Sequence, residues 1–166
     1  MISPELLRRY EYFSGLDANQ IATLAQLADK KAFEEGDYIF HEGEDVDEFY
    51  LVIDGAVGIV IEVPDHDIEQ PVSGQLTGEM KTKDIAISTI GAGMIFGWPG
   101  IIPPHEANAT AKALTLCNVI AINAHGLQKS FKHDNDLAYK MTLKAAQVIR
   151  DRLRDLQIES LAFLTS

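Results

Sequence analysis

The side chains best suited to binding an anion, the arginines, stand only near the two ends of this 166-residue chain. They are Arg8, Arg9, Arg150, Arg152 and Arg154. A guanidinium can hold a phosphate or carboxylate through two parallel hydrogen bonds. Because the formal net charge is −11 and the middle of the chain has no arginine, we expect no direct contact with nucleic acid, whose affinity depends on Lys and Arg.

Side chains that could act as nucleophiles or metal ligands are scattered. The serines Ser14, Ser73, Ser88 and Ser130 lack the surroundings of a nucleophile elbow. The histidines other than His41 are His66, His105, His125 and His133, which are dispersed along the chain. His41 is interpreted as a turn or surface histidine. No catalytic residue, metal site or cofactor is expected.

The single cysteine, Cys117, precedes an apolar run and is interpreted as an inert, buried thiol. It cannot form an internal disulfide, which favours a reducing, cytoplasmic setting. No apolar stretch is long enough to span a membrane, and the first residues do not have the pattern of a secretory signal. With 46% hydrophobic residues, the chain is expected to form one well-buried domain.

Two helices are predicted before the first strands. The pair Ser3–Pro4 has the pattern of an N-cap followed by a proline at the first helical position, which predicts a short helix over Ser3–Tyr10. Asp17 and Gln20 have the spacing of a capping box, and apolar residues recur after them at helical intervals. A second helix is therefore predicted over Asp17–Lys30.

From Phe33 to Ile122 the pattern changes to short β-branched and aromatic runs separated by glycines and acidic turns. The predicted strands are Tyr38–Phe40, Phe49–Ile53, Val57–Val63, Ile85–Ile90, Ala109–Ala113 and Val119–Ile122. Many short strands at this spacing indicate a sandwich or a closed roll. The polar stretch from Pro64 to Lys83 is interpreted as an extended hairpin connection.

A last helix is predicted from Asp134–Asp136, which offers N-cap residues, towards Ser160. Two stripes follow helical spacing. One stripe is Thr142, Ala146, Ile149, Leu153, Leu156 and Ser160, and the other is Leu137, Met141, Ala145 and Val148. One can pack on the strands while the other meets a partner helix, which favours a homodimer through the C-terminal helix. The alternative is one broad stripe on a single core.

Several glycine-punctuated segments occur in the order and spacing of a known family. They are Tyr12–Leu16, Phe33–Phe40, His41–Glu44, Phe49–Val57, Ile90–Gly97 and Asn118–Ile122. On these residues, nearly the whole chain resembles the cyclic-nucleotide-binding domains of the catabolite activator protein and of the protein kinase A regulatory subunits. The resemblance implies a mainly β fold: a double-stranded β-helix, or jelly-roll-like β-roll, with short N-terminal helices and a long C-terminal helix.

The resemblance also implies where a ligand would bind. The candidate pocket comprises Phe96, Gly97, Trp98, Pro99, Gly100, Ile101, Ala107, Asn108 and Ala109. The glycines, Ile101 and Ala109 agree with the family pattern. Asn108 stands where a serine or threonine is usual.

Two departures from the pattern concern the ligand directly. The family holds the ribose 2′-hydroxyl with a glutamate and the phosphate with an arginine, but here Trp98 and Ala107 stand at those positions. Losing a charge-assisted contact at a buried site costs roughly several kcal/mol, which is more than about a hundredfold in affinity. The nearest cation, Lys112, has no direction fixed by the sequence. We therefore expect cyclic AMP and cyclic GMP to bind weakly or not at all.

Trp98 allows three interpretations. Its ring can fill the pocket that the family uses, stack on a neutral or aromatic ligand, or face a partner surface. The prolines around it stiffen the segment under each interpretation.

A second resemblance suggests a metal enzyme instead. Gly36, His41, Glu48 and Gly55 resemble part of the metal-binding motif of cupins. However, Gly43 replaces the second histidine, and Gly36 to His41 is one residue short of the motif's spacing. A catalytic metal usually needs about three protein ligands. A cupin-like enzyme is therefore an alternative, as is a ligand-free dimerisation or protein-interaction module.

The function favoured is sensing or regulation without catalysis. Residues 1–134 are expected to form the β-roll with its N-terminal helices, and residues 135–166 the C-terminal dimerisation or signal helix of the same unit. A small-molecule ligand of unknown identity would reposition this helix, as the resemblance implies. Family transcription factors continue into a DNA-binding motif, so the chain is expected to be either a stand-alone module or a sensor cut from a longer protein.

Overall fold

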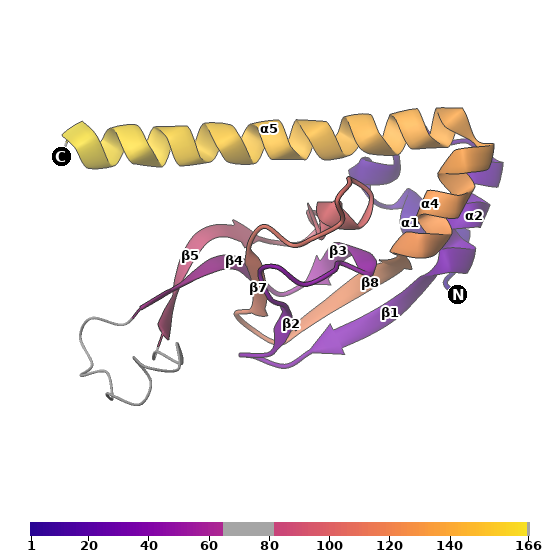
Figure 1. Cartoon of the computed structure of the whole chain (residues 1–166). Helices are drawn as coiled ribbons and strands as arrows, with labels where there is room; N and C mark the ends of the chain where they lie inside the picture. The colour runs from indigo at the N-terminus through magenta and orange to yellow at the C-terminus, as the bar shows by residue number, and fades with distance from the viewer. Residues whose placement is uncertain (65–81, 166) are drawn as a thin grey trace.

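Residues 1–64 and 82–165 are described by the computed structural model shown in Figure 1. The chain begins with helix α1 (Pro4–Arg8), the 3₁₀ turn η1 (Glu11–Phe13) and helix α2 (Ala18–Leu27). Both predicted N-terminal helices are therefore present. The first is shorter at each end than the sequence pattern indicated.

The caps of these two helices differ from each other. Asp17 and Gln20 form the predicted capping box: the Gln20 N–H donates to Asp17 Oδ1 at 2.8 Å, and the Asp17 N–H donates to Gln20 Oε1 at 3.0 Å. Ser3 occupies the N-cap position of α1 but makes no side-chain capping bond. Gln20 is itself buried and its amide donates to Asp136 Oδ2 at 2.8 Å, which ties α2 to the start of the C-terminal helix.

Eight strands are found in the described residues. They are β1 (Ala28–Phe33), β2 (Tyr38–Phe40), β3 (Glu48–Asp54), β4 (Val57–Pro64), β5 (Thr82–Ile90), β6 (Ile95–Phe96), β7 (Thr110–Ala113) and β8 (Cys117–Asn123). They form two four-stranded sheets with the orders β1-β8-β3-β6 and β2-β7-β4-β5, and every pairing is antiparallel. The predicted strands are all present, and β4 pairs with β5 as the hairpin interpretation requires. Its connection, residues 65–81, lies outside the described residues.

The sequence pattern also misassigned the boundary between the second helix and the first strand. It extended the second helix to Lys30, but α2 ends at Leu27 and β1 follows immediately. The residues of β1 pair with β8 from Ala28 opposite Ile122 to Phe33 opposite Cys117. Because β8 is a central strand, completing its hydrogen bonds outweighs the helical propensity of the segment.

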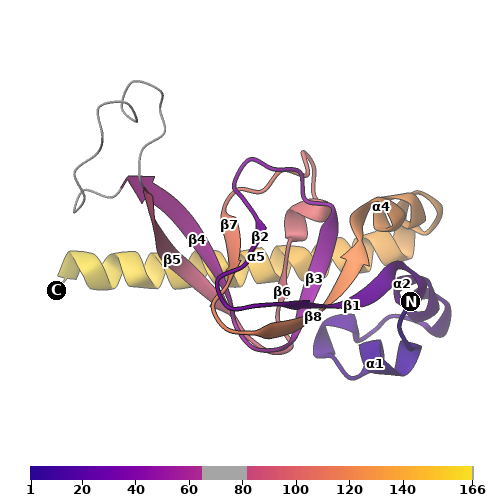
Figure 2. The ribbon, with the colours of Figure 1, turned by 90° about the horizontal axis from the view of Figure 1, so that it is seen from below.

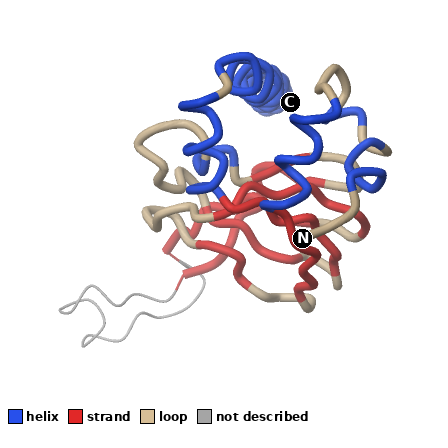
Figure 3. Tube along the Cα trace, turned by 90° about the vertical axis from the view of Figure 1, so that its right-hand side faces the viewer, coloured by secondary structure: helices blue, strands red, loops and turns tan. Residues whose placement is uncertain are grey.

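The central strands β3 and β8 are buried on both faces, and alternate residues contribute to two cores. The core between the first sheet and the helices, called here the helix-side core, includes Phe13, Leu24, Phe49, Leu51, Ile120, Ile122, Leu127, Leu137 and Met141. The core between the two sheets, called the roll core, includes Phe40, Val46, Tyr50, Val52, Phe96, Ala107, Ala111, Val119 and Ala121. Figure 3 shows this layering, with the helices gathered on one side of the strands.

Two helices follow β8. The first, α4 (Ala124–His133), was not predicted, although Asn123 caps it by accepting a hydrogen bond from the Gly126 N–H at 2.7 Å. The second, α5 (Asn135–Thr165), confirms the long C-terminal helix. Asp134 supports its start, because its Oδ1 accepts from the Leu137 N–H at 3.0 Å.

Helix α5 runs along the roll and continues past it (Figures 1 and 2). Its residues Leu137, Met141 and Ala145 are buried and Val148 packs against the helix-side core, as one predicted stripe requires. On the other stripe, Leu153 and Leu156 are exposed. The helices of the described ranges include none with the length and apolar character needed to cross a membrane.

Candidate functional site

The candidate pocket lies in the chain segment between β6 and β7. After β6 the chain turns at Gly97, whose φ is +75°, and enters the 3₁₀ turn η2 (Trp98–Gly100). A Cβ at Gly97 would lie 2.9 Å from the Glu48 carbonyl oxygen and 2.9 Å from the Tyr50 ring. Glycine is therefore required here both by the backbone conformation and by the close approach to β3.

The structure divides the predicted pocket residues between different surroundings. Phe96 and Ala107 lie in the roll core, whereas Ile101 belongs to the helix-side core. Asn108 is exposed. The remaining residues, Gly97, Pro99, Gly100 and Ala109, are buried. These residues thus lie in different surroundings, and a ligand pocket formed by them stays a prediction.

Trp98 does not fill the roll. Its ring is partly buried and packs against the helix-side core. The reason is the turn at Gly97, since Phe96 points into the roll core and the backbone then reverses before Trp98. The interpretation that Trp98 occupies the pocket is corrected accordingly, while its contact with a ligand or a partner stays a prediction.

Three other aromatic rings pack inside the roll next to the segment. Tyr50 and Phe96 are stacked, with ring centroids 4.6 Å apart and planes 6° apart. Phe40 lies 6.5 Å from Tyr50 and 6.3 Å from Phe96 between ring centroids. The Tyr50 hydroxyl donates to Glu48 Oε2 at 2.9 Å, and burial together with this carboxylate raises the pKa of Tyr50 well above its usual range. Sequence reasoning did not identify this aromatic group.

The main chain around position 107 is already hydrogen-bonded. The Ala107 N–H donates to the Glu44 carbonyl at 2.8 Å, and the Gly43 N–H donates to the Ala107 carbonyl at 2.8 Å. The Val46 N–H donates to the His105 carbonyl at 2.9 Å. Because these bonds join the segment to the loop between β2 and β3, the Ala107 N–H is not directed at a ligand.

The cation nearest in sequence to the segment is held elsewhere. Lys112 Nζ lies 3.0 Å from Asp84 Oδ2 and 5.0 Å from the centre of the Tyr38 ring. Its neighbours Ala111 and Ala113 point into the roll core, so alternation places Lys112 on the outer face of its sheet. The direction that the sequence left open is therefore away from the roll interior.

The surface hollow beside β3 carries mostly negative charge. It has a volume of about 400 Å³ and is lined by Glu44, Asp45, Asp47 and Glu48, with Lys31 as the cation. Lys31 Nζ is bonded to Glu48 Oε1 at 2.6 Å. This hollow would repel a phosphate rather than attract it.

The cupin-like residues are engaged in other contacts. His41 Nδ1 lies 3.0 Å from Glu62 Oε1 on β4, and Glu48 is bonded by Lys31 and Tyr50. Within the described ranges, no cluster of three or more His, Cys, Asp or Glu side chains is arranged to hold a metal ion. Cys117 is buried, as predicted, and burial raises the pKa of its thiol.

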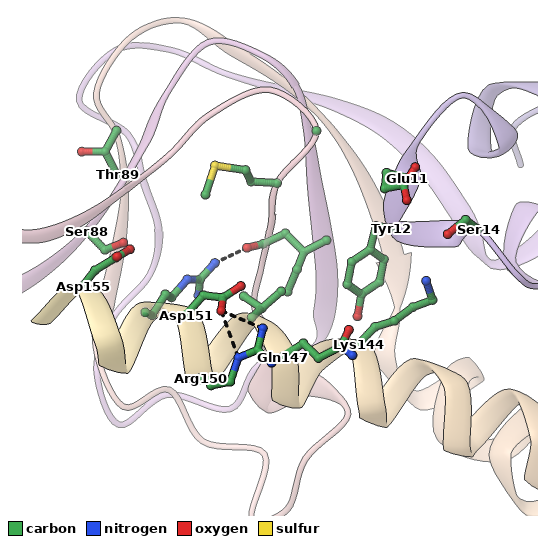
Figure 4. Close-up of a pocket in the computed structure, with 15 residues that line it drawn as sticks. Glu11, Tyr12, Ser14, Ser88, Thr89, Lys144, Gln147, Arg150, Asp151 and Asp155 are labelled. Carbon is green, nitrogen blue, oxygen red and sulfur yellow. Dashed lines mark hydrogen bonds and ion pairs between the residues drawn. The ribbon is translucent and has the colours of Figure 1, made fainter. Parts of the chain in front are cut away.

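A groove of about 600 Å³ opens at a different place, between α5, η1 and the turn from β5 to β6 (Figure 4). Lys144, Gln147, Asp151 and Asp155 lie along its helical wall. Sequence reasoning missed this groove because its residues come from positions 11 to 155, and no local spacing connects them.

Comparison with known proteins decides the family. The family model described as "Cyclic nucleotide-binding domain" matches residues 30–134 of this chain. The chain belongs to the cyclic nucleotide-binding domain family. This confirms the resemblance inferred from the glycine-punctuated segments, and the cyclic nucleotide-binding family is one of regulatory domains.

Solved structures share the fold of this chain. A structure described as a "Putative Cyclic nucleotide-binding protein" from Geobacter metallireducens GS-15 has a TM-score of 0.73 and 25% identity, covering 92% of this chain and 99% of that one. The sensor domain of the transcriptional regulator DNR from Pseudomonas aeruginosa has a TM-score of 0.63 and 20% identity, covering 90% of each chain. The cyclic nucleotide-binding domain therefore accounts for most of this chain.

One curated relative is much longer. The "Putative potassium channel protein RPA4233" of Rhodopseudomonas palustris is 24% identical over 160 residues, which are 96% of this chain and 34% of that protein. This chain thus spans about a third of the length of that relative.

Proposed function

We propose that this cyclic nucleotide-binding domain is a non-catalytic sensory or regulatory module that does not hold cyclic AMP or cyclic GMP in the manner of its family. The observation that carries the proposal is the surroundings of Ala107, where the family resemblance places the phosphate-binding arginine. The side chain there is a buried methyl group, and its N–H is bonded to Glu44. A cyclic phosphate would meet neither a guanidinium nor a free main-chain donor at this position.

The roll interior supports the same conclusion. Phe40, Tyr50 and Phe96 pack against one another next to the segment, and the nearby surface hollow is lined by carboxylates. A ligand that did enter at Gly97–Ile101 against Asn108 and Ala109 would have to be neutral or cationic. The contacts of His41 with Glu62 and of Glu48 with Lys31 and Tyr50 argue against the alternative of a cupin-like metal enzyme.

Calorimetric titration with cyclic AMP and cyclic GMP tests this proposal. We expect no saturable binding in the micromolar range for either nucleotide. A family domain that retains the glutamate and the arginine serves as the positive control under the same conditions. Micromolar binding of either nucleotide to this chain would refute the proposal.

We further propose that residues 1–134 form the sensing unit and that residues 135–166 transmit its state through a homodimer. The support is the stripe of α5 that faces away from the roll, where Leu153 and Leu156 are 55% and 40% exposed. Exposed leucines at helical spacing on a surface helix are typical of helix pairing. The net charge of −11 supports protein or small-molecule partners rather than nucleic acid, and the free thiol of Cys117 fits a reducing, cytoplasmic setting.

The dimer proposal is tested by light scattering coupled to size exclusion. We expect a dimer for the unmodified chain and a monomer for the Leu153→Glu, Leu156→Glu double variant. Arg154→Gln is the matched control, because it changes an exposed residue of the same turn and leaves the stripe apolar. A monomer for the unmodified chain, or a dimer for the double variant, would contradict the proposal.

A further inference from the structure

The groove beside α5 is bounded by three separate parts of the chain. Tyr12 comes from η1, Ser88 and Met94 come from β5 and the turn after it, and Lys144 and Arg152 come from α5. In Figure 4, Ser88, Thr89 and Asp155 lie at one end and Glu11, Tyr12 and Ser14 at the other, with α5 forming the wall between them. Its volume of about 600 Å³ is in the range of small-molecule sites.

Arg152 is the side chain that distinguishes this groove. It is partly buried, and its Nη2 donates to the Ile95 carbonyl oxygen on β6. Its Nε is shielded from solvent and has no hydrogen-bond partner, a condition found at no other buried side-chain nitrogen or oxygen of the described ranges. Burial lowers the pKa of Arg152 to about 10, so the guanidinium remains charged near neutral pH. An unsatisfied donor on a buried cation is unfavourable unless an acceptor approaches it.

The other cations of the groove already have partners. Arg150 donates to Asp151 Oδ1 from Nε at 3.0 Å and from Nη2 at 2.9 Å. Lys144 Nζ lies 5.8 Å from the centre of the Tyr12 ring. These pairs therefore leave Arg152 Nε without an acceptor.

The charges around the groove restrict what that acceptor can be. Glu11, Asp151 and Asp155 line it together with the cations. These carboxylates repel a doubly charged anion more strongly than a singly charged one. Met94 and Val148 add apolar surface to the lining. A singly charged carboxylate on a short apolar body satisfies these conditions better than a doubly charged phosphate.

We propose that the groove is a binding site for a small organic monocarboxylate that draws the Arg152 side chain into the groove, so that its shielded Nε becomes able to donate a hydrogen bond to the carboxylate while the apolar part of the ligand lies against Met94 and Val148. The site is separate from the segment between β6 and β7, because it shares none of the pocket residues predicted there. With about 100° of rotation per helical residue, Leu153 faces away from Lys144, Asp151 and Asp155, whereas Leu156 lies four residues after Arg152 and is its neighbour on the helix surface. The proposal does not depend on whether a cyclic nucleotide binds.

The first test compares a charged probe with its neutral twin on the unmodified chain. Hexanoate and hexanamide are titrated separately while amide NMR signals are followed, with ionic strength held constant by chloride. We expect saturable shifts centred on Thr89, Met94 and Gln147 with hexanoate, and affinity at least about tenfold weaker for hexanamide because it loses the charge-assisted bond. Equal affinities, shifts elsewhere, or no saturation by hexanoate would overturn the proposal.

The second test assigns the binding to Arg152. Arg152→Gln is expected to weaken hexanoate binding by about tenfold or more, while Arg154→Gln, which removes the same charge from an exposed position of the same helix, leaves it within about twofold. Equal weakening by the two substitutions would show a general charge effect and would overturn the assignment. If Arg152→Gln does not fold, the comparison of hexanoate with hexanamide still decides. The titration with cyclic nucleotides tests the segment between β6 and β7, so its outcome does not affect the result of the hexanoate experiments.

Discussion

An arginine at position 107 would restore the cation that the family resemblance places there, and it tests whether the roll can accept one. Ala107 is 4% exposed and belongs to the roll core with Phe40 and Tyr50. Its N–H and carbonyl are bonded to Glu44 and Gly43 at 2.8 Å each. Leaving a charge buried without a partner costs about 3–5 kcal/mol, out of the roughly 5–15 kcal/mol that hold a typical domain folded.

We therefore expect Ala107→Arg to lower the free energy of unfolding by about 3 kcal/mol or more in urea denaturation, with no gain of micromolar affinity for cyclic AMP. Asn108→Arg is the matched control: the neighbouring side chain is exposed, so the same charge should change stability by no more than about 0.5 kcal/mol. A loss of unfolding free energy below about 1 kcal/mol for Ala107→Arg, or micromolar nucleotide binding by that variant, would refute the conclusion that position 107 is buried in the roll core with its main chain already hydrogen-bonded.

Two further predictions concern the framework of the roll. Gly55→Ala should lower the free energy of unfolding by about 3 kcal/mol, because φ is +88° and a Cβ would lie 2.4 Å from a main-chain oxygen of the turn before β8. Gly36→Ala, with φ of +90° and no atom within 4 Å of the added Cβ, should cost only about 1 kcal/mol; equal losses in urea denaturation would contradict the steric explanation. Burial raises the pKa of Asp84, but hydrogen bonds from Tyr38 and Lys112 outweigh it and hold the pKa below its usual range. The stability from Asp84 is therefore present above its unfolded pKa and is lost as pH falls through the lower folded value, so the thermal midpoint of Asp84→Asn should fall less on acidification than that of the unmodified chain.

Six of the eight described strands, all but β1 and β6, could be predicted from sequence because their signals are local. Tyr38–Phe40 and Val57–Val63 combine β-branched or aromatic runs with glycines at the turns, and the structure has strands at both places. The segment Ala28–Phe33 was only partly predictable, since its first residues continue a helical pattern and only pairing with β8 makes them a strand. Helix α4 was missed because its polar composition hides one buried face, which includes Leu127.

The site was less predictable than the fold. The substitution of Ala107 and Trp98 for the family's charged residues can be seen in the sequence, and so can the expected weakness of nucleotide binding. The direction of the Trp98 ring cannot be seen in the sequence, because it depends on the turn at Gly97. The contact of Arg152 with Ile95 joins residues far apart in sequence, so only the packed structure reveals it.

The length of α5 has a mechanical consequence. A 31-residue helix extends about 46 Å, and its apolar contacts with the roll are made by the half that contains Leu137, Met141 and Val148. The last part of this length, roughly 20 Å from Leu153 to Thr165, has exposed side chains. A tilt of about 10° at the last packed turn would swing the far end by about 3 Å. A displacement too small to disturb the β-strands would thus become larger along α5. The movement would be greatest at the far end of the helix, where another protein could be attached.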